Sequence, residues 1–443
     1  MKHEKLILCL LVITCLLTAG INGAISLENK KTPKVVVIGV DGLGWNILNP
    51  MISEGRVPFI NKMMSNGAYG NFNSSSKHLR SQPIWTSMIT GLSLLEHGFY
   101  VKGGYYFPYF SSDSLNLGRY SQLSDIKGKK IWEYLNDNDI TATMLNLAFT
   151  YPVEKINGIM LSGEFAPTFY LSNDKLNTIY PENLRNELIE NVGDYEFQKY
   201  GLDFIKKVAN SKIFNLVVSL MGNENMRPAF FNFMRINIWQ TFLKKKGMNY
   251  LTAKIKNEKL LDQIADILKE NDIKRAKTFL YLMQSHPTDF TFIYFTAGGF
   301  LEYFFYPFPK DSKDYSDTTE KYGHLVGDYV KFIDDFLNEV EKIHGENTII
   351  ILLADHGIAP CDGEWCCNDA DLCQSRTMHI KDGVFLIYSS KMKDGSGINI
   401  DRLYDIDLLP LVLQIYDMEI PKNLSSKIKS ENKDLLEKVL KSL

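Results

Sequence analysis

The chain has 443 residues, 45% hydrophobic and 23% charged, which is enough for a large globular domain with its own core. A formal net charge of -3 provides no general field that would attract a nucleic-acid duplex or an anionic membrane surface. An anionic ligand would therefore need a local site, and a bound divalent cation would supply one.

The first residues predict an export signal. Lys2 and Lys5 precede a short apolar run at residues 6–17, and small residues follow up to Ala24. The run is shorter than the roughly 20 apolar residues that span a bilayer. We expect residues 1–24 to be a cleaved signal peptide of a secreted or periplasmic protein, with an uncleaved N-terminal anchor as the alternative.

Apolar, β-branched runs that predict buried strands recur along the chain, at residues 34–40, 141–147, 290–296 and 348–354. Helical patterns separate them: one starts at Pro58 and stops at Gly67, one surrounds residues 132–135, and a long one covers about 322–343. Alternating strands and helices predict an α/β fold with a doubly wound, mostly parallel central sheet.

The predicted organisation has four parts. The α/β core is expected over residues 33–164 and 286–425, and residues 426–443 are expected to form a C-terminal helix. Residues 165–285 contain few strand-like runs and show helical periodicity, so we expect a mainly helical insertion or cap there.

Four cysteines crowd into one short segment: Cys361, Cys366, Cys367 and Cys373. In an oxidising compartment they predict two disulfides, with three possible pairings. A small metal-binding knuckle is the alternative. Either arrangement would cross-link the loop that contains these four cysteines.

Potential metal ligands follow two of the predicted strands. Asp41 ends the first strand, and Asp355 and His356 end the strand at residues 348–354, while His379 precedes another apolar run. Ligands of open α/β sheets bind beyond the carboxyl ends of the strands, and carboxylates with imidazoles bind zinc and related cations. Helix capping and a structural hydrogen bond are the alternative roles for an isolated Asp or His.

These segments, in this order, resemble the alkaline-phosphatase superfamily, specifically its type I phosphodiesterase/nucleotide pyrophosphatase branch. The resemblance is carried by the segment around Asp41, by residues 81–91, by Ala-Asp-His-Gly at 354–357 and by residues 379–385. Residues 150–163 are similar to the predicted phosphohydrolase/phosphomutase subgroup. An alkaline-phosphatase type of fold is what the resemblance implies.

The resemblance also implies a two-metal site. Ser81 matches the nucleophile that forms a covalent phospho-enzyme, and Asp41, Ser81, Asp355 and His356 match the ligands of one metal. His379 matches a ligand of the second metal. Zinc is the expected cation, with Mn²⁺ or Mg²⁺ as alternatives, and one or two ions are expected.

The sequence departs from the family at the second metal. Relatives carry an Asp and a His four residues apart after the strand that matches 290–296, where this chain has Gly299 and Tyr303. Glycine offers no ligand atom, and a phenol with a pKa near 10 is a poor substitute for imidazole. Glu302 would have to turn inward to compensate, and we expect instead that His379 is left without ligand partners.

The sequence therefore predicts an exported, metal-dependent phosphohydrolase or phosphodiesterase with a serine nucleophile, working with one metal ion or with two. Its expected substrates are small phosphate mono- or diesters of nucleotide or phospholipid type, and no residue is assigned to substrate binding. The alternative is a catalytically inactive relative that binds a phosphate-bearing ligand or acts as a scaffold.

Overall fold

The computed structural model describes residues 32–76, 81–98, 123–147, 150, 152–163, 178–193, 258–361, 377–392, 397–425 and 430–443. The elements named below all lie within the unit formed by residues 34–443.

A mixed sheet forms the centre of the fold, in the order β11-β2-β10-β7-β1-β6-β3-β4-β5 among the described strands. Its strands are β1 (Lys34–Val40), β2 (Ala68–Asn73), β3 (Ala142–Leu147), β4 (Gly158–Ser162), β5 (Ile179–Tyr180), β6 (Phe290–Phe295), β7 (Thr348–Leu353), β10 (Gly383–Ser389) and β11 (Ile398–Tyr404). The pairs of β1 with β6 and β7, and of β3 with β4 and β6, are parallel, whereas β10 runs antiparallel to β2 and β7. The predicted mostly parallel α/β sheet is confirmed.

Strand register brings the carboxyl ends of three neighbours to one edge. Val40 pairs with Phe295 on one side of β1, and Gly39 pairs with Leu353 on the other. The segments that leave β1, β6 and β7 therefore emerge together, as expected for a ligand site in an open α/β sheet.

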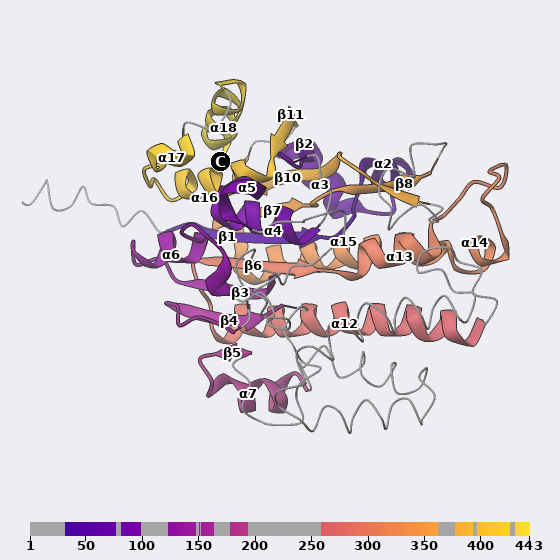
Figure 1. Ribbon diagram of the computed structural model, residues 1–443, viewed down its shortest axis with the longest axis horizontal. Helices are drawn as coiled ribbons and strands as arrows, with labels where there is room; N and C mark the ends of the chain where they lie inside the picture. Colours follow the sequence, from indigo (N-terminus) through magenta and orange to yellow (C-terminus); the bar gives the residue numbers. More distant parts are fainter. Residues whose placement is uncertain are drawn as a thin grey trace, which may run out of the picture. The chain divides into compact units, whose positions relative to one another are not determined.

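Helices cover both faces of the sheet (Figure 1). Because strand side chains alternate, Val36, Ile38 and Val40 contribute to one core cluster and Val35 and Val37 to the other. The first cluster is completed by α2 (Trp45–Ser53), α3 (Pro58–Asn66), α12 (Glu258–Ser285), α13 (Ala297–Phe305) and α15 (His324–His344), and the second by α4 (Ser81–Thr90), α6 (Ile131–Asn136) and α16 (Leu408–Ile415). The remaining α-helices are α5 (Leu94–His97), α7 (Leu184–Asn191), α14 (Asp317–Tyr322), α17 (Lys422–Ser425) and α18 (Ser430–Ser442).

A second, two-stranded sheet lies beyond β7. It pairs β8 (Gly357–Pro360) with β9 (Thr377–Ile380) in antiparallel fashion, so that Ile358 faces His379. This pairing brings His379 back to the segment that contains Asp355 and His356.

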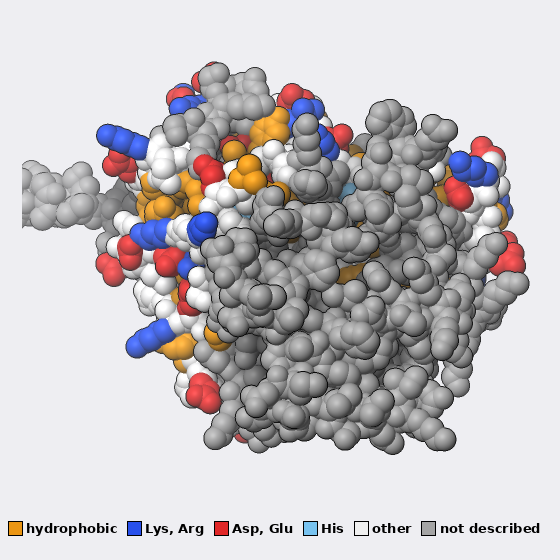
Figure 2. Space-filling view, in the orientation of Figure 1, with side chains coloured by type: hydrophobic (Ala, Val, Ile, Leu, Met, Phe, Trp, Pro, Cys, Tyr) orange, Lys and Arg blue, Asp and Glu red, His pale blue; other side chains and the backbone are white. Residues whose placement is uncertain are grey.

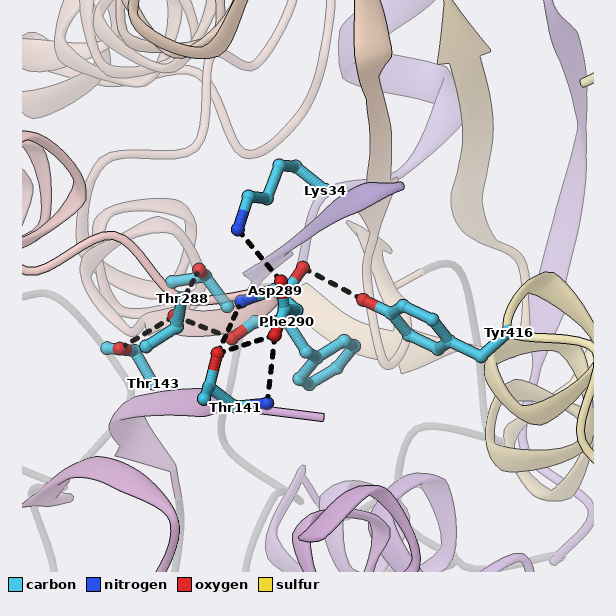
Figure 3. A network of polar contacts seen from close by, with 8 residues as sticks. Lys34, Thr141, Thr143, Thr288, Asp289, Phe290 and Tyr416 are labelled. Atoms are coloured by element: carbon cyan, nitrogen blue, oxygen red, sulfur yellow. Dashed lines mark hydrogen bonds and ion pairs between the residues drawn. The ribbon is translucent and has the colours of Figure 1, made fainter. Parts of the chain in front are cut away.

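A polar network joins the amino-terminal ends of three strands, opposite the ends from which Asp41 and Asp355 emerge (Figure 3). The Asp289 carboxylate accepts hydrogen bonds from Lys34 Nζ at 2.9 Å and from Thr141 Oγ1 at 2.7 Å, and Tyr416 OH donates to the Asp289 carbonyl at 2.8 Å. These contacts fix the starts of β1, β3 and β6 against α16.

Several predictions concern segments only partly described. Of the predicted insertion at 165–285, the structure describes 178–193 and 258–285, and α12 packs against α13 and α15. The signal segment lies outside the described residues, as do Cys366, Cys367 and Cys373, while Cys361 follows β8. The domain boundaries, the signal and the disulfides stay predictions.

The distribution of charged side chains on the surface agrees with the small net charge of the chain. Basic and acidic side chains are interspersed along the described part of the face in Figure 2. Among the helices that the structure describes, none combines the length and apolarity needed to cross a membrane.

Candidate active site

Three of the predicted ligands meet at the carboxyl edge of the sheet. Asp41 directly follows β1, and Asp355 and His356 lie between β7 and β8. One potential ligand atom from each lies within 4.8 Å of the other two. His356 Nε2 is 3.3 Å from Asp355 Oδ2 and 3.7 Å from Asp41 Oδ1. We call these residues the triad.

Ser81 lies beside the triad, as the first residue of α4. Its Oγ is 3.1 Å from His356 Nε2. The other ring nitrogen, Nδ1, is 3.2 Å from the Gly357 carbonyl, which can only accept a hydrogen bond. Nδ1 therefore carries the proton and Nε2 presents its lone pair to Ser81 and the two carboxylates.

Burial disfavours the charged forms of Asp355 and His356. Burial raises the pKa of Asp355 to about 7, although hydrogen bonds from the Ser81 hydroxyl and the Gly42 amide oppose the rise. Burial also lowers the pKa of His356, although the Asp41 charge opposes the fall. Among the described residues, Asp355 Oδ2 makes no hydrogen bond. The site thus offers the carboxyl groups of Asp41 and Asp355 and the unprotonated Nε2 of His356, and the buried Asp355 Oδ2 lacks a hydrogen bond. This set of ligand atoms fits a divalent cation.

Two residues set the position of Asp41, and of these the sequence singled out Gly299 alone, as a missing ligand. Tyr294 in β6 donates its hydroxyl hydrogen to Asp41 Oδ2 at 2.5 Å. On the other side, a Cβ atom at Gly299 would lie 2.3 Å from Asp41 Oδ1, so the carboxylate occupies space that any larger residue at 299 would need. In the sequence, Tyr294 is indistinguishable from the other buried aromatics of its strand.

The helix that carries Gly299 is itself fixed by a buried carboxylate. Asp272 in α12 accepts hydrogen bonds from the Ala297 amide at 2.8 Å and from Tyr329 OH at 2.7 Å, and it pairs with Arg275. Satisfying an amide in the first turn of α13 anchors this turn next to Asp41. A single Asp within an amphipathic helix gives no sequence signal of this contact.

The comparisons with known proteins agree with this arrangement. A model of the family described as type I phosphodiesterase/nucleotide pyrophosphatase matches residues 35–402. The chain belongs to this family.

Similar solved structures are distant. Human ectonucleotide pyrophosphatase/phosphodiesterase 5 is 11% identical, with 88% of this chain and 96% of that chain covered and a TM-score of 0.43. A putative sulfatase from Bacteroides thetaiotaomicron is 12% identical, with 89% and 73% covered and a TM-score of 0.47. Phosphonoacetate hydrolase from Sinorhizobium meliloti is 12% identical, with 74% and 58% covered and a TM-score of 0.38. No curated protein sequence matches the chain.

The residues expected at the second metal of this phosphodiesterase family do not join the triad. The His379 ring stacks on His356 with centroids 3.8 Å apart, and the Tyr303 ring lies 5.5 Å from His379. Glu302 is only 2% exposed. Glu302 lies three residues after Gly299 in α13 and does not belong to the group of ligand atoms that meet at the triad, so its exclusion from the cation site stays a prediction.

Cation binding should be coupled to a proton. Since Asp355 must ionise to bind a cation and its pKa is about 7 without one, protons compete below neutral pH. We expect the apparent cation affinity to be about tenfold weaker at pH 6 than at pH 8. Calorimetric titration with Mn²⁺ at the two pH values measures this, and equal affinities would contradict the role of Asp355.

The space beside Asp41 gives a second prediction. A Gly299→Ala methyl group would collide with Asp41 Oδ1, the movable end of a side chain, so the carboxylate should shift while the fold persists. We expect cation affinity to fall about tenfold or more, equivalent to about 1.4 kcal/mol, with little change in stability. Gly327→Ala is the matched control, because its methyl would meet the end of Arg56. Unchanged affinity in Gly299→Ala would show that Asp41 is not a ligand.

Proposed function

We propose that this chain is an exported, cation-dependent phosphohydrolase that cleaves phosphate mono- or diesters with Ser81 as nucleophile. The observation that carries the proposal is the 3.1 Å contact of Ser81 Oγ with His356 Nε2, at a triad of cation ligands. Membership of a phosphodiesterase/nucleotide pyrophosphatase family supports phosphate esters as the substrate class. Small esters of nucleotide or phospholipid type are the expected substrates, and zinc is the expected cation, with Mn²⁺ or Mg²⁺ as alternatives.

The triad residues and Ser81 Oγ would hold the cation. A divalent cation there would lower the pKa of the Ser81 hydroxyl and stabilise negative charge on the phosphoryl oxygens. Asp41 and Asp355 supply carboxylate oxygens, and His356 supplies Nε2 because its Nδ1 is engaged by the Gly357 carbonyl. The N-terminal end of α4, where Ser81 lies, also favours an anionic group through the helix dipole.

The chemistry divides into two displacements at phosphorus. Ser81 releases its hydroxyl proton to solvent, and its Oγ bonds to phosphorus while the bond to the leaving oxygen breaks. The leaving group departs with that electron pair. Water then bonds to phosphorus as the Ser81 Oγ–phosphorus bond breaks, and the serine regains a proton.

The proposal is tested with purified mature protein and two chromogenic substrates, p-nitrophenyl phosphate and bis-p-nitrophenyl phosphate. We expect cation-dependent release of p-nitrophenol from at least one of them, lost with a chelator and restored by added Zn²⁺ or Mn²⁺. If a cation binds but neither ester is cleaved, the inactive, phosphate-binding alternative is favoured, in keeping with Gly299 and Tyr303. Mass measurement of the secreted chain tests the predicted removal of residues 1–24.

A further inference from the structure

Trp85 follows Ser81 by one helical turn in α4 and is buried against the sheet. Residues four apart share a face of a helix, so Ser81 and Trp85 lie on the same side of α4. The Trp85 ring packs against two residues of β6, with centroid distances of 4.3 Å to Tyr294 and 6.1 Å to Phe292. This large ring therefore holds the first turn of α4, which carries Ser81, against the sheet.

The sheet leaves room for the Trp85 ring at Gly39, two residues before Asp41. A Cβ atom at Gly39 would lie 2.3 Å from Trp85 Cη2 and 2.6 Å from Cζ3, so any larger residue would displace the ring. Gly39 pairs with Tyr294 in β6 and with Leu353 in β7. The ring thus packs on the middle one of the three strands whose carboxyl ends meet at the site.

Tyr294 continues the contact from Trp85 to the triad, because its hydroxyl donates to Asp41 Oδ2. Asn146 in β3 holds the other side of Tyr294, with its Nδ2 donating to the Tyr294 carbonyl at 2.6 Å. Asn146 has a φ of 62°, in the left-handed region that few residues other than glycine adopt, at the point where β3 shifts register against β4. Such irregularities re-aim groups next to active sites. Tyr294 is thereby fixed between Trp85 and Asp41.

The Trp85 indole N–H is buried and makes no hydrogen bond with any described residue. A buried donor without an acceptor is unfavourable, and folded proteins contain few of them. Phenylalanine would avoid this cost, but it lacks the Cη2 and Cζ3 atoms that fill the space above Gly39. The cost of the buried donor is therefore offset by a contact that only the larger ring makes.

We propose that Trp85 is a positioning residue that sets where Ser81 lies relative to the cation site. It acts through its contacts with Gly39 and Tyr294, which belong to the strands beside Asp41. The inference rests on the proposed function, in which Ser81 Oγ contacts a cation held by the triad. Displacing a reacting group by an ångström can lower a rate by about a hundredfold. A smaller ring at position 85 would let the first turn of α4 move while the triad stays in place.

Trp85→Phe should lower kcat for bis-p-nitrophenyl phosphate by about tenfold or more and change KM little, because a displaced nucleophile slows the reaction without weakening substrate binding. Trp132→Phe is the matched control. Trp132 is equally buried in α6, where its indole N–H donates to Glu154 at 2.9 Å. The control should lose thermal stability and keep kcat within about twofold of wild type. Equal kcat values in the two variants would overturn the positioning role.

The double variant Gly39→Ala/Trp85→Phe tests the contact itself, also if Trp85→Phe alone does not fold. The new methyl group would occupy the space that Cη2 and Cζ3 vacate, so kcat should recover most of the loss seen in Trp85→Phe. Gly39→Ala alone should lower kcat, because its methyl group collides with the indole. A double variant no more active than the less active single variant would contradict the proposal.

Mn²⁺ affinity provides a measurement that does not depend on turnover. Ser81→Ala should weaken Mn²⁺ by about fivefold in the wild-type background and by less than about twofold in Trp85→Phe, where Ser81 is already displaced. Calorimetric titration of the four mature chains measures this. The same loss in both backgrounds overturns the positioning role even if the esters are cleaved. An inactive wild type with the predicted difference refutes the proposed hydrolysis alone, and a wild type that binds no Mn²⁺ refutes both.

Discussion

Replacing Ser81 with alanine should lower phosphoester turnover by roughly 10⁴-fold or more, because the covalent route is lost. Only binding and electrostatic stabilisation would remain, and these usually retain a small residual rate. Side-chain volume changes little and Ser81 is half-buried, so the fold should persist. Steady-state turnover of bis-p-nitrophenyl phosphate with saturating cation measures the effect.

Ser87→Ala is the matched control for Ser81→Ala. Ser87 lies in the same helix, is buried, and contacts His97 Nε2 at 3.2 Å instead of the triad. Its loss should cost about 1 kcal/mol of stability and leave turnover unchanged. Equal turnover in Ser81→Ala and wild type would remove Ser81 from the nucleophile role.

Asp355→Asn should abolish cation-dependent stabilisation and raise the stability of the cation-free protein. The pKa of Asp355 is about 7 in the folded chain against 3.8 for an unperturbed aspartate, so the folded state holds a proton that the unfolded state has released. Wild-type stability should therefore fall as pH rises from about 4 to 7. The amide does not ionise, so the stability advantage of Asp355→Asn should grow by a few kcal/mol over this window.

Urea unfolding at pH 5 and pH 8 measures this, with chelator and with Mn²⁺. At 100 times its Kd, Mn²⁺ should stabilise wild type by about 2.7 kcal/mol and Asp355→Asn by much less. Asp334→Asn, at a buried aspartate outside the site, should keep the Mn²⁺ effect. A cation effect that survives in Asp355→Asn would mean that the ion binds elsewhere.

The buried parallel strands could be predicted because their residues are almost uniformly apolar and β-branched, as in β1 and β7. The neighbouring β2 and β11 gave no comparable signal, since Gly70, Asn71 and Asp401 interrupt any apolar run. Their places are set by pairing with strands distant in sequence, which local composition does not encode.

The triad could be predicted because Asp41 directly follows β1, and Asp355 and His356 lie just beyond the end of β7. The contacts that position them could not. Tyr294 reaches Asp41 only through the register of β6 against β1, and Asp272 reaches α13 only through the packing of α12. The burial of Glu302 likewise depends on how α13 is rotated about its axis. The sequence around Glu302 does not determine that rotation.

The account depends on a cation that the triad holds beside Ser81. Anomalous diffraction from crystals soaked in Zn²⁺ at pH 8 tests this most directly. We predict an anomalous peak about 2.0–2.2 Å from Asp41 and Asp355 oxygens and from His356 Nε2, with Ser81 Oγ next to it. Zinc bound at other residues, with the triad unchanged, would contradict the account.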